Sequence, residues 1–184
     1  LLGKLLAEKN IAVVSGGALG CDIASHQGAL DNEKSPALAI CVLAGGLHEF
    51  YPKKNKAVFS QIRNKNGLII SERLWWSNSR APDFRSRNRI IAGLAPVTAV
   101  MQAGEKSGAL ITATYALEQG RELVCLIHEL KDVRAKGTNY LIEQGAKCFP
   151  EASKGLEVLA SLAMQPVDSI SRFVTGFAGE ELSY

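Results

Sequence analysis

Three arginines lie within five residues of one another, directly after an aromatic residue and in a segment with helical spacing. Arg85, Arg87 and Arg89 follow Phe84, and Asn88 lies among them. A guanidinium group binds phosphate through two hydrogen bonds, and a neighbouring ring can stack on an unpaired base. A helix starting at Arg85 would hold these cations near its positive end, which is unfavourable unless they neutralise anions. The segment predicts a phosphate-binding surface, with an arginine-rich solvated face as the alternative.

Two glycine-containing turns each join an apolar run to a segment with helical spacing. The first turn contains Ser15, Gly16 and Gly17. The second turn contains Lys106, Ser107 and Gly108, and Thr112 follows one helical turn later. Backbone N–H groups at the start of a helix can bind phosphate where glycine leaves the backbone accessible. Strand-to-helix turns also need small residues for packing and capping, so that role remains the alternative at both places.

The sequence contains no evident catalytic or metal-binding motif. Its four cysteines and three histidines are scattered, and none is spaced like the ligands of a zinc site. We find no nucleophile elbow and no matched acid and base. We therefore expect no catalytic residues, no metal and no cofactor, and a binding protein rather than an enzyme.

Apolar runs alternate with segments of helical spacing along the whole chain. Strands are expected at residues 11–14, 37–44, 68–71, 97–102, 122–127 and 147–149, and helices at 1–9, 21–30, 53–64, 85–94, 108–119, 137–144 and 151–164. Strands that are apolar throughout are buried on both faces, so the pattern predicts a doubly wound, mostly parallel α/β sheet. Both glycine turns would then lie at the carboxyl edge of the sheet, where ligands bind in such folds.

The composition is typical of a soluble globular domain. Of the 184 residues, 47% are hydrophobic and 21% are charged, and the formal net charge is +3. No apolar stretch is long enough to span a membrane, and scattered cysteines favour a reducing compartment, so we expect a cytoplasmic protein without a membrane partner. The expected core covers residues 1–164. Residues 165–184 are expected to form a C-terminal tail or linker, because the periodic pattern fades there.

Several blocks of the sequence, in this order, resemble the DprA/Smf (DNA-processing protein A) family over roughly residues 1–160. Residues 15–30 resemble the family pattern S-G-x-A-x-G-I-D…A-H-x-G-A-L. The most specific blocks are Arg87–Gly93, which resembles R-N-R-I-I-A-G, and Ser107–Ala113, which resembles S-G-x-L-I-T-A. The resemblance implies an extended Rossmann-like fold. The family's first strand, with its Gly-Ser-Arg turn, has no counterpart here and is expected to be missing ahead of Leu1.

The resemblance also implies a function. It implies a homodimer that binds and protects single-stranded DNA and delivers it to a RecA-type recombinase in recombination or natural transformation. It places the DNA pocket around Gly16, Gly17, Arg87, Asn88, Arg89, Lys106, Ser107 and Gly108. The alternative is a nucleotide-processing enzyme of the LOG phosphoribohydrolase class, whose P-G-G-x-G-T turn is not found in this sequence.

Two adjacent tryptophans, Trp75 and Trp76, lie in a segment without regular spacing. Neighbouring residues on a regular strand point to opposite sides, so both indoles cannot face the interior of a strand. We expect one to pack against the protein and the other to be available for a base or a protein contact.

Overall fold

The computed structural model describes residues 1–31, 39–48, 50–65, 67–163 and 173–175. The helices are α1 (Leu2–Glu8), α2 (Cys21–Leu30), α3 (Lys56–Asn64), α4 (Ala81–Gly93), α5 (Gly108–Glu118), α6 (Lys136–Glu143) and α7 (Ala152–Ala163), with short 3-10 helices η1 (Lys53–Asn55) and η2 (Val133–Ala135). The strands are β1 (Ala12–Ser15), β2 (Ala39–Val42), β3 (Leu68–Ile70), β4 (Val97–Val100), β5 (Glu122–Leu126), β6 (Lys147–Phe149) and β7 (Phe173–Thr175). No helix among these residues is both long and apolar enough to cross a membrane.

The strands form one parallel sheet in the order β3-β2-β1-β7-β4-β5-β6. Val14 lies opposite Ile40 on one side of β1, and Val97 lies opposite Glu122 on β5. This arrangement confirms the predicted parallel α/β fold. β7 lies within the segment expected to be a tail and joins the two halves of the sheet, so β1 and β4 are not direct neighbours.

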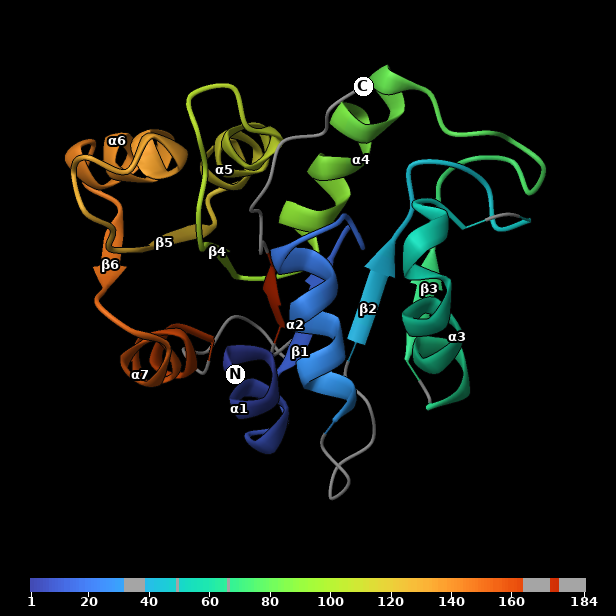
Figure 1. Ribbon diagram of the computed structural model, residues 1–184, viewed down its shortest axis with the longest axis horizontal. Helices are drawn as coiled ribbons and strands as arrows, with labels where there is room; N and C mark the ends of the chain where they lie inside the picture. Colours follow the sequence, from blue (N-terminus) through green and yellow to red (C-terminus); the bar gives the residue numbers. More distant parts are fainter. Residues whose placement is uncertain (32–38, 49, 66, 164–172, 176–184) are drawn as a thin grey trace.

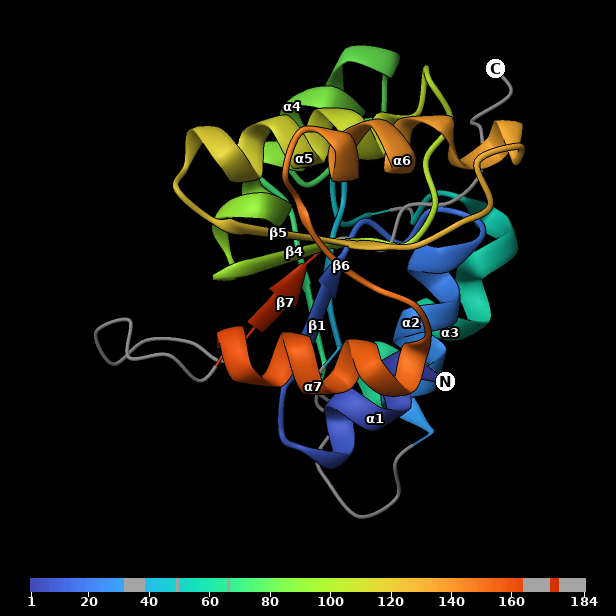
Figure 2. The ribbon, with the colours of Figure 1, turned by 90° about the vertical axis from the view of Figure 1, so that its left-hand side faces the viewer.

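Helices cover both faces of the twisted sheet, as Figures 1 and 2 show. One face is covered by α4, α5 and α6, and the other by α1, α2, α3 and α7. The strands β1 and β4 are buried along their whole length, which explains their continuous apolar sequence. Between the sheet and the second layer, Leu6, Ile11 and Phe59 are fully buried, and each contributes about 2 kcal/mol of hydrophobic stabilisation.

Helix α4 begins four residues earlier than the sequence predicts, at Ala81 rather than Arg85. Pro82 fits the first turn because an N–H group there has no helical acceptor. The Asp83 carboxylate accepts a hydrogen bond from the backbone N–H of Arg80 at 2.9 Å. The arginines therefore lie in later turns of α4, and the prediction that they stand at its positive end is wrong.

Candidate nucleic-acid interface

Both predicted glycine turns lie at the carboxyl edge of the sheet, because β1 and β4 are parallel strands of the same sheet. This edge faces upward in Figure 1, and the loops that follow β1, β2, β3 and β4 all emerge from it. Helix α4 crosses this edge and packs against both α5 and β2. The fold thus gathers the sequence-predicted residues into one region, but it buries some of them.

The first turn directs its backbone N–H groups into the protein. Oδ2 of Asp22, near the start of α2, accepts hydrogen bonds from Gly16 N at 3.1 Å and from Ala18 N at 3.2 Å. The Gly17 carbonyl accepts a hydrogen bond from Asn55 Nδ2 at 2.8 Å. Ser15 is buried as well. The protein's own carboxylate therefore occupies the position that the sequence suggests for a phosphate.

Packing also explains the glycines of this turn. A Cβ at Gly16 would lie 2.5 Å from Nη2 of Arg87. Gly17 has a φ of +68°, which disfavours other residues, and a Cβ there would lie 2.6 Å from the Phe59 ring. The alternative considered for this turn, a need for small residues, accounts for both glycines without a ligand.

Arg87 is the main departure from the sequence-based expectation, because its side chain is buried rather than exposed. Its Nη1 donates to the carbonyl oxygens of Val42 and, at 3.0 Å, of Gly16, so it joins α4 to the ends of β1 and β2. Burial lowers the pKa of Arg87, and the negative charge of Asp22 opposes that effect. The guanidinium thus supports the carboxyl edge from beneath its surface.

The neighbours of Arg87 on α4 are Asn88, which contacts the second turn, and the exposed Arg85 and Arg89. Asn88 accepts a hydrogen bond from Arg87 Nε at 3.2 Å and donates to the Gly108 carbonyl at 3.3 Å. Arg89 is exposed and forms an ion pair with Glu72. Arg85 is exposed, and no partner for it is found within the described part of the chain. Of the three arginines, Arg85 is the one most open to a ligand.

Phe84 is half-buried and belongs to a small aromatic contact at the same edge. Its ring meets that of Tyr51 in an edge-to-face arrangement, with centroids 5.8 Å apart. The Arg87 guanidinium carbon lies 5.9 Å from the Phe84 ring centroid. Tyr51 is exposed and was not predicted as a site residue, although its loop follows β2 and so must lie at this edge.

The second turn is open to solvent. Ser107 caps α5, since its Oγ accepts a hydrogen bond from Ala109 N at 3.2 Å. Lys106 and Gly108 are exposed, and a Cβ at Gly108 would meet no atom within 4 Å. Thr112 is buried, and its hydroxyl lies 3.5 Å from the Gly108 carbonyl. Lys106, Ser107 and Gly108 therefore line an accessible helix start, whereas Thr112 supports it from within.

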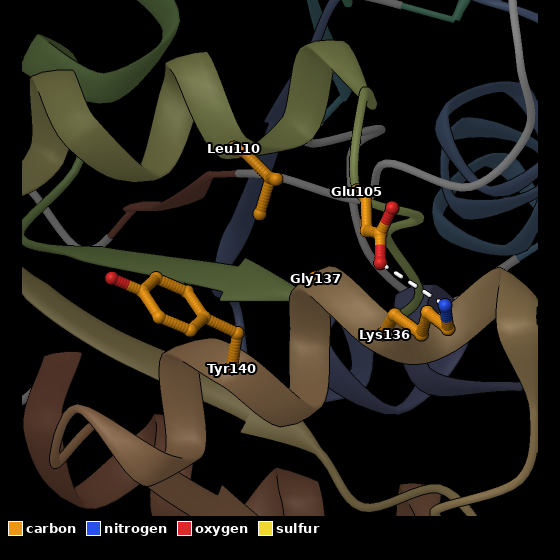
Figure 3. Close-up of a pocket in the computed structure, with 5 residues that line it drawn as sticks. All are labelled: Glu105, Leu110, Lys136, Gly137 and Tyr140. Carbon is orange, nitrogen blue, oxygen red and sulfur yellow. Dashed lines mark hydrogen bonds and ion pairs between the residues drawn. The ribbon is translucent and has the colours of Figure 1, made fainter.

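A hollow of about 410 Å³ lies beside this turn (Figure 3), lined by Glu105, Leu110, Lys136, Gly137 and Tyr140. The Lys136 ammonium group lies 3.1 Å from a Glu105 carboxylate oxygen and closes one side. Gly137 packs so closely that a Cβ would lie 2.6 Å from the Gly104 carbonyl oxygen. The α6 residues of this hollow were missed from the sequence, although their helix starts at the same sheet edge after β5.

Two potentially reactive side chains are buried below the first turn. Burial lowers the pKa of His26 to about 4 and raises the pKa of Cys41 to about 12. Near neutral pH the imidazole is therefore neutral and the thiol protonated. Across the described ranges, no group of three or more His, Cys, Asp or Glu side chains could hold a metal ion.

Comparison with known proteins gives one consistent family. A family model described as DNA recombination-mediator protein A matches residues 1–160. DNA processing protein DprA of Bacillus subtilis is 38% identical over 164 residues, which cover 89% of this chain and 54% of that protein. Protein Smf of Escherichia coli is 34% identical over 159 residues, which cover 86% of this chain and 42% of that protein. The chain thus spans about half the length of these curated relatives.

Two solved structures share the fold. DNA processing protein A from Streptococcus pneumoniae matches with a TM-score of 0.75 and 34% identity, covering 88% of this chain and 55% of that one. DNA processing protein A from Helicobacter pylori matches with a TM-score of 0.77 and 32% identity, covering 87% of this chain and 71% of that one. The Helicobacter structure describes how that protein binds single-stranded DNA.

Proposed function

Since the chain belongs to the DNA recombination-mediator protein A family, we propose that it binds single-stranded DNA at the carboxyl edge of its sheet. The observation that carries the proposal is the turn before α5, where Lys106 and Gly108 are exposed and the space above Gly108 is open. A phosphate can reach the backbone there without displacing a side chain, and the positive end of α5 favours an anion.

Around this phosphate position, α4 and the loop after β2 supply further contacts. Arg85 offers a second exposed positive charge. The exposed Tyr51 ring and the half-buried Phe84 ring offer surfaces for unpaired bases. Arg87 and the first glycine turn have a different role in the proposal: they hold β1, β2 and α4 in place beneath the DNA.

The wider biological role is part of the same proposal. As the family resemblance implies, the protein forms a homodimer and delivers single-stranded DNA to a RecA-type recombinase in recombination or natural transformation. It acts in the cytoplasm and binds DNA without cleaving it. The names of its relatives, which refer to DNA processing, support the DNA-related part of this role.

The test is a fluorescence anisotropy titration with one labelled oligonucleotide, single-stranded and as a duplex, at several salt concentrations. Single strands should bind more tightly, because bases in a duplex are already stacked. Their affinity should fall with a log–log salt slope of about −0.7 per phosphate contact. Equal affinity for the duplex, or no response to salt, would contradict the proposal.

The same assay separates DNA binding from the enzyme alternative. Unlabelled mononucleotides are added as competitors, and the mixtures are then analysed for hydrolysis products. A nucleotide-processing enzyme should bind mononucleotides in preference to oligonucleotides and convert them. The proposed DNA-binding protein should show weak competition and leave the mononucleotides intact.

A further inference from the structure

Two tryptophans project from the loop that joins β3 to α4, which we call the tryptophan loop (residues 72–80). Trp75 and Trp76 are 62% and 69% exposed, and the preceding Leu74 is 64% exposed. The expectation that one indole packs against the protein is therefore wrong. Exposing three adjacent large apolar side chains forgoes hydrophobic stabilisation, and such patches mark binding surfaces.

Backbone hydrogen bonds hold the tryptophan loop in place, so the indoles are not needed to anchor it. The backbone N–H and Nδ1 of His48 each lie 3.0 Å from the Trp75 carbonyl oxygen. Gly46 N donates to Ser77 O at 2.7 Å. A Cβ at Gly46, in the loop after β2, would lie 2.2 Å from the Leu74 carbonyl oxygen. The tryptophan loop and the loop after β2 therefore pack backbone to backbone. The two indoles are thus presented to solvent on an anchored support.

This support is continuous with the proposed DNA site. The tryptophan loop and the loop after β2 run side by side at the right of Figure 1, on the carboxyl edge of the sheet. Tyr51, three residues after His48, contacts Phe84 on α4. The loop after β2 therefore contacts both the tryptophan loop, through His48, and α4, through Tyr51.

The charges around these rings suit a polyanion. Among the described residues, the carboxylates at the two ends of the loop are paired with arginines, Glu72 with Arg89 and Asp83 with Arg73. Lys54 is exposed on η1, directly after the loop that carries Tyr51. A partner that supplies flat apolar rings and negative charge together matches this surface.

We propose that Trp75 and Trp76 form a second contact for single-stranded DNA, on which unpaired bases stack after the strand has crossed α4. This inference rests on the proposed function and extends it to a part of the surface outside the α4–α5 site. Every base has a flat face, so this contact adds affinity without selecting a sequence. A duplex cannot use it, because its bases are stacked on one another.

The sequence offers a direct optical test, because Trp75 and Trp76 are the two tryptophans of the chain. Tryptophan emission therefore reports on this loop alone, while the anisotropy of a labelled oligonucleotide reports on binding anywhere. The anisotropy is followed in titrations of the parent protein, of Trp75→Ala/Trp76→Ala and of Leu117→Ala. The emission is followed in the parent and in Leu117→Ala, because the double variant contains no tryptophan. Leu117 is a matched control, because it is 58% exposed near the opposite end of α5. Thermal melts check that all three proteins are folded.

We expect DNA to quench the emission of the parent with the same midpoint as the anisotropy change. The double variant should bind at least about fivefold more weakly, from the loss of at least one stacked base, and the control should bind like the parent. Binding with unchanged emission, and with unchanged affinity in the double variant, would overturn the inference and leave the proposed function intact. Emission that changes with protein concentration in the absence of DNA would also overturn it, because the loop would then be a contact between copies of the chain. No binding by any probe would refute the proposed function itself.

Discussion

Replacing Arg87 with methionine should destabilise the fold, although the sequence alone suggests a surface arginine whose loss the fold tolerates. The guanidinium is buried and donates to the carbonyl oxygens of Gly16 and Val42, and its charge opposes that of Asp22. Its removal leaves two buried carbonyl oxygens without this donor, at about 1–3 kcal/mol each, and takes away the positive charge that offsets the buried Asp22 carboxylate, so we expect a total loss of about 3–5 kcal/mol. In a protein of this size, this loss corresponds to a decrease in Tm of about 10 °C.

The assay is urea unfolding of four proteins: the parent, Arg87→Met, Asp22→Asn and the double variant. Methionine keeps much of the volume, and the amide oxygen of the asparagine would still accept the Gly16 and Ala18 N–H groups. The double variant has no uncompensated buried charge, so its loss of stability should be smaller than the sum of the two single losses by at least about 1 kcal/mol. Arg85→Ala is the matched control, an exposed arginine on the same helix, and should change stability by less than about 0.5 kcal/mol.

DNA binding by the same variants decides between a supporting and a contacting role for Arg87. At a temperature where Arg87→Met is folded, its affinity for single-stranded DNA should stay close to that of the parent. Unchanged stability together with a loss of binding of tenfold or more would refute the reasoning. Arg87 would then have to be a phosphate contact that reaches the surface.

Two further predictions concern His26 and Lys106. Because burial lowers the pKa of His26 to about 4, the unfolded chain takes up a proton at higher pH than the native protein, and the free energy of unfolding should fall as the pH drops from 6.5 towards 4. Urea unfolding should show that the free energy of unfolding falls by about 1–2 kcal/mol between pH 6.5 and 5 because of this residue. If the free energy of unfolding of His26→Gln falls by the same amount, His26 is not the source of the pH dependence. Lys106 is exposed, so Lys106→Gln should leave Tm unchanged and make the salt slope of single-strand binding less steep by about 0.7; an unchanged slope would remove Lys106 from the phosphate contacts.

The fold could be predicted from the sequence because its determinants are local. Buried parallel strands have continuous apolar runs, and helix α2 spans the same residues that its spacing predicts. The helical spacing of apolar residues begins only at Arg85, whereas α4 begins at Ala81, because proline is common in a first helical turn and Pro82 does not end the helix there. β7 has only three residues, and its place depends on pairing with β1 and β4, which its own sequence does not reveal.

The site was predicted in outline, but the roles of its residues depend on contacts between distant segments. A charged residue is normally expected at the surface, yet Arg87 lies on the same helical face as Ile91, four residues later and buried, and this spacing was the available signal. The use of the first turn's N–H groups by Asp22 becomes visible only once α2 is placed. The exposure of both tryptophans could not be predicted, because backbone contacts with the loop after β2 hold their segment in place.

The most direct test of the account is the replacement of Gly108 with valine at the start of α5. The space above Gly108 is empty, so the variant should fold with an unchanged Tm, while its side chain occupies the position proposed for a phosphate. Thr114→Val, a change of similar shape at an exposed position on the same helix, serves as the control. The account predicts that Gly108→Val binds single-stranded DNA at least about tenfold more weakly, a loss of about 1.4 kcal/mol, and that Thr114→Val binds like the parent. A folded Gly108→Val protein that binds as tightly as the parent would contradict the account, because no phosphate could then lie at this turn.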